Sequence, residues 1–118
     1  MKKAFSAALI ITIIVFAVSC SKESGGGGTT TVDCNTVTNK AFAADVSPII
    51  QSSCAIAGCH ASGSTNGPGQ LTNYTEVFSA RSSIRSAVSS GRMPQTGSLS
   101  TAQKNSIICW IDSGAPNN

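Results

Sequence analysis

One short segment concentrates side chains that bind metals and form covalent bonds through sulfur. It reads Cys54-Ala55-Ile56-Ala57-Gly58-Cys59-His60, with four residues between the two cysteines and a histidine directly after the second. These residue types allow a structural disulfide, a redox-active thiol pair, part of a zinc site, or the attachment of a haem. A zinc site needs three or four protein ligands. Because His60 is the only histidine, zinc would also require Cys34 or Cys109 nearby.

Covalent haem attachment is the chemistry that the order of these residues favours. The common attachment signature is Cys, two residues, Cys, His, whereas the spacer here has four residues. The adjacency of cysteine and histidine is the geometrically tighter half of that signature, because the imidazole must turn under the iron as its axial ligand. The spacer contains small residues, which let its two extra positions bulge outward. The sequence therefore predicts one haem c attached through Cys54 and Cys59, with His60 as the proximal ligand.

A second axial ligand is expected because haems that transfer electrons are usually six-coordinate, with methionine or histidine on the distal side. No second histidine exists, and outside the N-terminal segment the only methionine is Met93. It is next to Pro94 in a segment bounded by glycines, outside any helical pattern, where core packing gives it little reason to be. We therefore predict that His60 and Met93 together ligate the haem iron.

The N-terminal segment has the order of a secretory signal. Two lysines precede an apolar run over residues 7–18, and Ser19 and Cys20 follow. The run is shorter than the ~20 residues of a membrane-spanning helix. The cut site resembles the lipobox of bacterial lipoproteins, with Ala17 at the place of the usual leucine. This resemblance implies a signal peptide over residues 1–19 and acylation of Cys20, which would anchor the mature chain to a membrane.

The segment after Cys20 is rich in glycine and threonine and has nothing to pack, so residues 20–33 are predicted to be a flexible tether. The folded domain is then residues 34–118. An odd number of cysteines in an exported chain needs an explanation. Lipidation of Cys20 leaves two pairs, and outside the cytoplasm disulfides persist. Beside the haem pair, Cys34 and Cys109 are expected to form a disulfide that ties the start of the domain to its last helix.

Three apolar patterns predict helices, and no segment shows the alternation of a strand. The first covers about residues 40–53 and leads into Cys54, with Pro48 as a kink or a second start. The second runs over residues 73–91 and opens with a capping box of Asn73 and Glu76, and the third runs over residues 100–114. We expect an all-α domain of three to four helices around one haem.

These features together resemble the short monohaem class I cytochromes c, and more narrowly the planctomycete-type cytochrome c domains of bacterial lipoproteins. The resemblance covers residues 42–118. It is carried by Val46-Ser47-Pro48-Ile49-Ile50, by the segment 54–60, by Arg92-Met93-Pro94 and by Trp110-Ile111-Asp112-Ser113-Gly114-Ala115-Pro116. It implies thioether links at both motif cysteines, ligation by His60 and Met93, and first and last helices that cross beside the haem. The four-residue spacer and the short interval from His60 to Met93 depart from the family pattern.

The expected function is one-electron transfer between redox proteins, by an exported, lipid-anchored carrier that faces the periplasm or the cell surface. Two of the eight Lys and Arg residues belong to the predicted signal peptide, so the mature chain has six of them and five Asp and Glu residues. This nearly balanced charge gives no reason to expect a nucleic-acid partner. No pairing of an acid with a base suggests a small-molecule substrate or an enzyme activity. Asp33, Asp45 and Asp112 have no evident partner and are expected to be solvated.

Two other functions fit the same residues. In one, Met93 is not bound, and a five-coordinate haem serves as a sensor or a weak peroxidase. In the other, the chain is a haem-free structural lipoprotein in which Cys54 and Cys59 form a disulfide.

Overall fold

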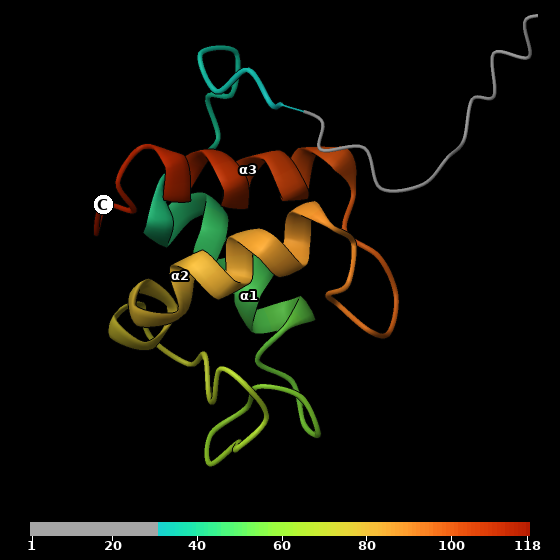
Figure 1. Ribbon diagram of the computed structural model, residues 1–118. Helices are drawn as coiled ribbons and strands as arrows, with labels where there is room; N and C mark the ends of the chain where they lie inside the picture. The colour runs from blue at the N-terminus through green and yellow to red at the C-terminus, as the bar shows by residue number, and fades with distance from the viewer. Residues whose placement is uncertain (1–30) are drawn as a thin grey trace, which may run out of the picture.

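The computed structural model describes residues 31–118, which form three α-helices joined by loops (Figure 1). The helices are α1 (Ser47–Ser53), which is preceded directly by a π-helical turn, η1 (Phe42–Val46), then α2 (Tyr74–Ser89) and α3 (Thr101–Asp112). No strand occurs in this range, so the prediction of an all-α domain is confirmed. The predicted signal peptide at 1–19, the lipidation site Cys20 and the tether up to residue 30 lie outside the described residues.

Between residues 31 and 118, no helix combines the length and the apolar character needed to cross a bilayer.

The first helical segment changes its hydrogen-bond pattern at Pro48. Its opening turn is wide, because the Val46 N–H donates to the Ala41 carbonyl at 3.1 Å and the Asp45 carboxylate accepts from the Ala41 N–H at 2.9 Å. Proline is tolerated in the first turn of an α-helix, where its missing N–H is not needed, and Pro48 lies in the first turn of α1. Of the two alternatives for Pro48, the second start is therefore the one observed.

The other two helices begin where their capping residues predict. The Ser100 hydroxyl accepts from the Gln103 N–H at 3.2 Å, and the Gln103 side chain accepts from the Ser100 N–H at 2.9 Å, so α3 has a complete capping box. At α2 the Asn73 side chain accepts from the Glu76 N–H at 3.1 Å. The reciprocal bond is absent there, because the Glu76 carboxylate accepts from Thr72 instead. The predicted capping box at α2 is therefore only half formed.

The core lies where η1, α2 and α3 meet around Trp110, which is fully buried. The Trp110 ring centroid is 5.2 Å from that of Phe42, and Phe42 meets Tyr74 edge to face at 5.0 Å. Both polar aromatic groups are paired, because Trp110 Nε1 donates to the Pro116 carbonyl and the Tyr74 hydroxyl donates to the Ala115 carbonyl, each at 2.9 Å. These aromatic contacts fix α3 and the C-terminal segment against η1 and the start of α2.

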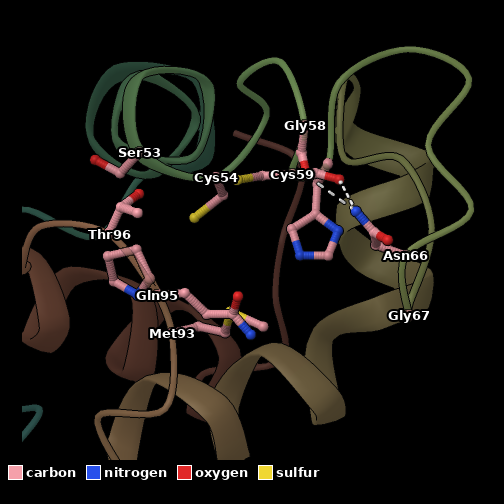
Figure 2. Close-up of a pocket in the computed structure, with 11 residues that line it drawn as sticks. Ser53, Cys54, Gly58, Cys59, Asn66, Gly67, Met93, Gln95 and Thr96 are labelled. Atoms are coloured by element: carbon pink, nitrogen blue, oxygen red, sulfur yellow. Dashed lines mark hydrogen bonds between the residues drawn. The ribbon is translucent and has the colours of Figure 1, made fainter.

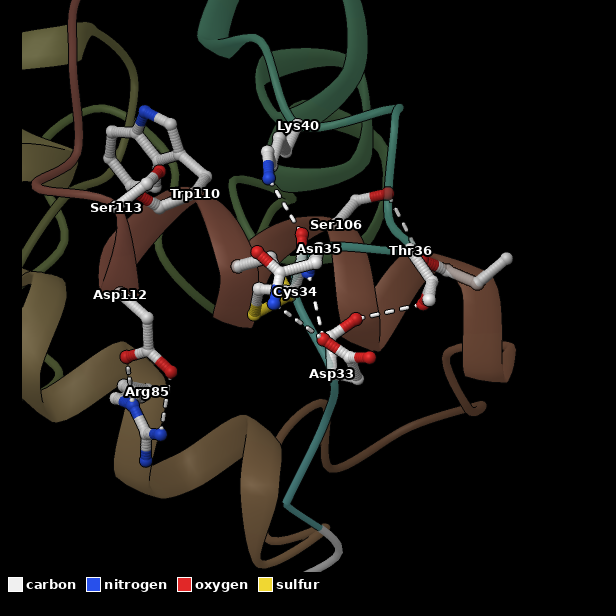
Figure 3. Close-up of a disulfide and its surroundings, with 12 residues drawn as sticks. Asp33, Cys34, Asn35, Thr36, Lys40, Arg85, Ser106, Trp110, Asp112 and Ser113 are labelled. Atoms are coloured by element: carbon white, nitrogen blue, oxygen red, sulfur yellow. Dashed lines mark hydrogen bonds and ion pairs between the residues drawn. A yellow bond between two sulfur atoms is a disulfide. The ribbon is translucent and has the colours of Figure 1, made fainter.

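A disulfide between Cys34 and Cys109 joins the start of the domain to α3, as predicted (Figure 3). Cys109 is fully buried on α3. The backbone at Cys34 is held as well, because Lys40 Nζ donates to the Cys34 carbonyl at 2.7 Å, and the Asp33 carboxylate accepts from the Asn35 N–H at 3.0 Å. The two cysteines are 75 positions apart in the sequence. The segment between them contains η1, α1, α2 and most of α3.

The expectation that Asp112 has no partner is wrong. Its carboxylate accepts two hydrogen bonds from the Arg85 guanidinium, at 2.5 and 2.8 Å, and so joins α3 to α2 (Figure 3). The two residues are 27 positions apart, and only the packing of one helix on the other brings them together. Asp33 and Asp45 are also paired, each with a backbone N–H of its own turn.

The Arg85–Asp112 pair predicts a small acid sensitivity of the fold. Hydrogen bonds from Arg85 lower the pKa of Asp112 below its ordinary value. A lowered carboxyl pKa contributes stability above the unfolded value near pH 4, and this contribution is lost as the pH falls through the lowered value. Because the pair is well exposed, we expect Asp112→Asn to cost about 0.5 kcal/mol at pH 7. The measurement is urea unfolding at pH 7 and pH 2.5, and an equal cost at both would contradict the prediction.

Candidate functional site

A cleft of about 430 Å³ opens between the loop that follows α1 and the loop that joins α2 to α3 (Figure 2). Cys54, Cys59 and His60 line it from the first loop, and Met93 lines it from the second. An adjoining cleft of about 380 Å³ shares Cys54, His60 and Met93 and continues along α2. The structure therefore brings the four residues predicted to bind haem to the walls of one cavity.

The motif loop folds back on itself, so that its two cysteines stay together. The Cys54 and Ala55 N–H groups both donate to the Ile50 carbonyl at the end of α1, at 2.9 and 2.8 Å, and the His60 N–H donates to the Cys54 carbonyl at 3.0 Å. The spacer residues Ile56 to Gly58 are exposed. Gly58 has φ +81°, a left-handed conformation that favours glycine. The two extra residues of the spacer are thus taken up on the outside of the loop.

The His60 side chain is held in one orientation. It is only 6% exposed, and its Nδ1 lies 2.8 Å from the Gly69 carbonyl oxygen. A carbonyl only accepts, so in the neutral ring Nδ1 carries the proton and Nε2 has its lone pair free. This is the arrangement found for metal-binding histidines, whose other ring nitrogen donates to a carbonyl or carboxylate. His60 is therefore prepared to ligate a metal through Nε2 at the cleft wall.

The two motif cysteines are free thiols in this structure, and both are half-buried. Figure 2 shows the Cys59 side chain directed towards Cys54, whose sulfur points into the cleft. Burial raises the pKa of the Cys54 thiol, and the neighbouring Cys59 raises it further. Redox-active cysteines have a lowered pKa and an electropositive surrounding. The raised pKa of Cys54 is the opposite of this pattern.

Met93 lies across the cleft from Cys54 (Figure 2). Its N–H donates to the Ala87 carbonyl at 3.2 Å, which fixes the segment to the end of α2. Gly91 and Gly97 have φ of +71° and +75°, so glycines supply the left-handed turns on both sides of Met93. The loop thus presents a half-buried thioether to the cavity.

The wall between these two loops is apolar and belongs mainly to α2. Ile84, Ala87 and Val88 form it, with Leu71 beside them. Ile84 and Val88 belong to the apolar pattern that predicted this helix, and the structure shows that they line the cavity as well as the core. Arg92 was not predicted to be a site residue. It is the one charged side chain among the described residues that line the two clefts. Its position next to Met93 in the sequence was the available signal.

Zinc binding through the remaining cysteines is ruled out by the disulfide, because Cys34 and Cys109 are bonded to each other and offer no thiolate. Within residues 31–118 no three His, Cys, Asp or Glu side chains gather at one point. The site is thus a cleft with two thiols and an imidazole on one side, a thioether on the other and an apolar wall from α2, in a small all-α domain.

Comparisons of the chain with protein-family models, with curated proteins and with solved structures find no match. The resemblance to the monohaem class I cytochromes c therefore stays a prediction.

Proposed function

We propose that this chain is an exported c-type monohaem cytochrome, lipid-anchored through Cys20, that carries single electrons between redox proteins. The observation that carries the proposal is the convergence of Cys54, Cys59, His60 and Met93 on one cleft. Three of these residues come from one loop, and the fourth comes from a separate loop beyond α2. Packing alone gives no reason for two unlinked thiols and an oriented imidazole to face a thioether across a cavity.

The residues of the cleft fit a haem c. Each cysteine S–H would add across one vinyl group of the porphyrin, which forms a C–S and a C–H bond and consumes no oxidant. His60 Nε2 and the Met93 sulfur would be the axial ligands. The cleft volumes lie in the usual range of about 300–1,000 Å³ for ligand sites, and Ile84, Ala87 and Val88 supply an apolar wall.

A bound haem supplies reversible one-electron chemistry at its iron, and the protein sets the conditions for it. The Gly69 carbonyl holds the proton of His60 on Nδ1 and makes the ring a more basic ligand. Ile84, Ala87 and Val88 of α2 give the same space an apolar wall. We propose no substrate and no independent enzyme activity, because these residues bind and tune a cofactor and offer no acid–base pair.

A pyridine haemochrome assay tests this function. We expect the full chain, produced with c-type maturation, to retain haem after acid–acetone extraction and to give the spectrum of a haem with two thioether bonds. A Cys54→Ser/Cys59→Ser variant is the control and should lose its haem on extraction. Complete extraction of haem from the wild-type protein would contradict the proposal.

A further inference from the structure

The carboxylate of Glu76 does not close a capping box and binds the chain that precedes α2 instead. It does not return to the Asn73 N–H, although the spacing allows a capping box. It accepts instead from the Thr72 N–H at 2.7 Å, from the Thr72 hydroxyl at 2.9 Å and from Gln70 Nε2. The backbone hydrogen bond from Thr72 is the main reason why the pKa of Glu76 is lowered. Glu76 is therefore ionised at neutral pH and holds the chain that precedes α2.

The held segment is the one that orients His60. Gly69 accepts from the imidazole Nδ1 at 2.8 Å, and the Leu71 N–H donates to the His60 carbonyl at 2.9 Å. Contacts therefore alternate along this extended segment. Residues 69 and 71 contact His60, and residues 70 and 72 contact Glu76. Each contact of the segment with His60 lies directly beside a residue that Glu76 holds.

Gln70 extends this network across the loop. While its Nε2 donates to Glu76, its Oε1 accepts from the Gly63 N–H at 2.8 Å. One amide side chain thus joins the N-terminal end of α2 to the segment that follows His60. Loss of Gln70 removes this link and leaves the bonds from Thr72 to Glu76, so the two roles of Glu76 can be separated by mutation.

From this geometry we propose that Glu76 and Gln70 are positioning residues for the axial imidazole, which they hold through Gly69. The inference rests on the proposed haem function. A strong hydrogen bond to Nδ1 makes the imidazole a better donor and stabilises oxidised iron. If the segment 69–72 is loosened, that bond weakens and the reduction potential rises.

The test is the reduction potential of the haem-loaded full chain, measured for the wild type, Gln70→Ala and Ser100→Ala. We expect Gln70→Ala to shift the ratio of oxidised to reduced protein at fixed potential at least threefold towards reduced, which is about 28 mV at 59 mV per tenfold. Ser100→Ala is the matched control, because it removes the N-cap of α3 and destabilises that helix without touching Glu76, Gln70 or the segment that holds His60. Its potential should stay at the wild-type value.

A second readout is the electron paramagnetic resonance spectrum of the oxidised protein, which reports the orientation of the imidazole. The spectrum should change in Gln70→Ala and stay unchanged in Ser100→Ala. If Gln70→Ala does not accumulate, Glu76→Gln is expected to shift the potential in the same direction. A Gln70→Ala protein with wild-type potential and spectrum would overturn the positioning role alone. A wild-type chain without covalent haem would overturn both this role and the proposed function.

Discussion

Replacement of Met93 by alanine is expected to turn the oxidised, haem-loaded protein from low-spin to high-spin and to lower its reduction potential. Methionine opposite histidine raises the potential of a haem, because the thioether favours reduced iron. His60 is the only histidine, and it would already ligate the iron on the opposite side of the haem. The other residues of the Met93 loop that line the cleft are Pro94, Gln95 and Thr96, none of which offers a sulfur or an imidazole. Water would then take the sixth position. Absorption spectra of both oxidation states and a redox titration provide the measurement.

Gln95→Ala is the matched control for Met93→Ala. Gln95 lines the same cleft from the same loop but is exposed and offers no sulfur. Its spectra and potential should be those of the wild type. If Met93→Ala also leaves the spectra unchanged, Met93 is not a ligand, and the five-coordinate sensor or peroxidase becomes the better description.

Removal of the Cys34–Cys109 disulfide should produce a large loss of stability. The bond closes 75 residues of sequence separation, which corresponds to about 4 kcal/mol on the chain-entropy estimate. A domain of this size buries a small core, so a loss of that size is a large part of its total stability. The measurement is urea unfolding of Cys34→Ser/Cys109→Ser against the wild type.

Reduction of the wild-type disulfide supplies an independent check on that variant. The wild type in excess thiol reductant should lose the same free energy of unfolding, and the Cys34→Ser/Cys109→Ser protein should not respond to reductant. A variant with wild-type stability would contradict the prediction, because it would show that the core alone holds the first segment against α3.

Most local features of this fold could be predicted from the sequence, but of the tertiary links only the Cys34–Cys109 disulfide could, because it follows from counting the cysteines. The beginnings of α2 and α3 follow from Asn73 and from Ser100 with Gln103, because capping bonds join residues three positions apart. The sequence did not predict that the turn over Phe42–Val46 is π-helical. Its buried residues Phe42 and Val46 are four positions apart, a spacing that fits an α-helix equally well. The Arg85–Asp112 pair depends on how two helices pack, and no pattern within either helix reveals it.

The same division holds for the candidate site. Its chemistry-bearing residues could be named because the adjacency of Cys59 and His60, and the isolation of Met93 in a glycine-bounded loop, are properties of the chain alone. The contacts that hold these residues in place could not be predicted. The bond from His60 to Gly69 and the use of Glu76 outside a capping box both arise from how the loop 61–72 folds against α2.

The mass of the intact chain, purified after production with c-type maturation, tests the central claim most directly. The account predicts that the chain, besides any acyl groups on Cys20, carries the added mass of one haem, which persists under denaturing conditions and disappears in Cys54→Ser/Cys59→Ser. Peptide mapping should place that mass on the segment 54–60. A homogeneous wild-type chain without added haem mass, with Cys54 and Cys59 joined in a disulfide, would contradict the account.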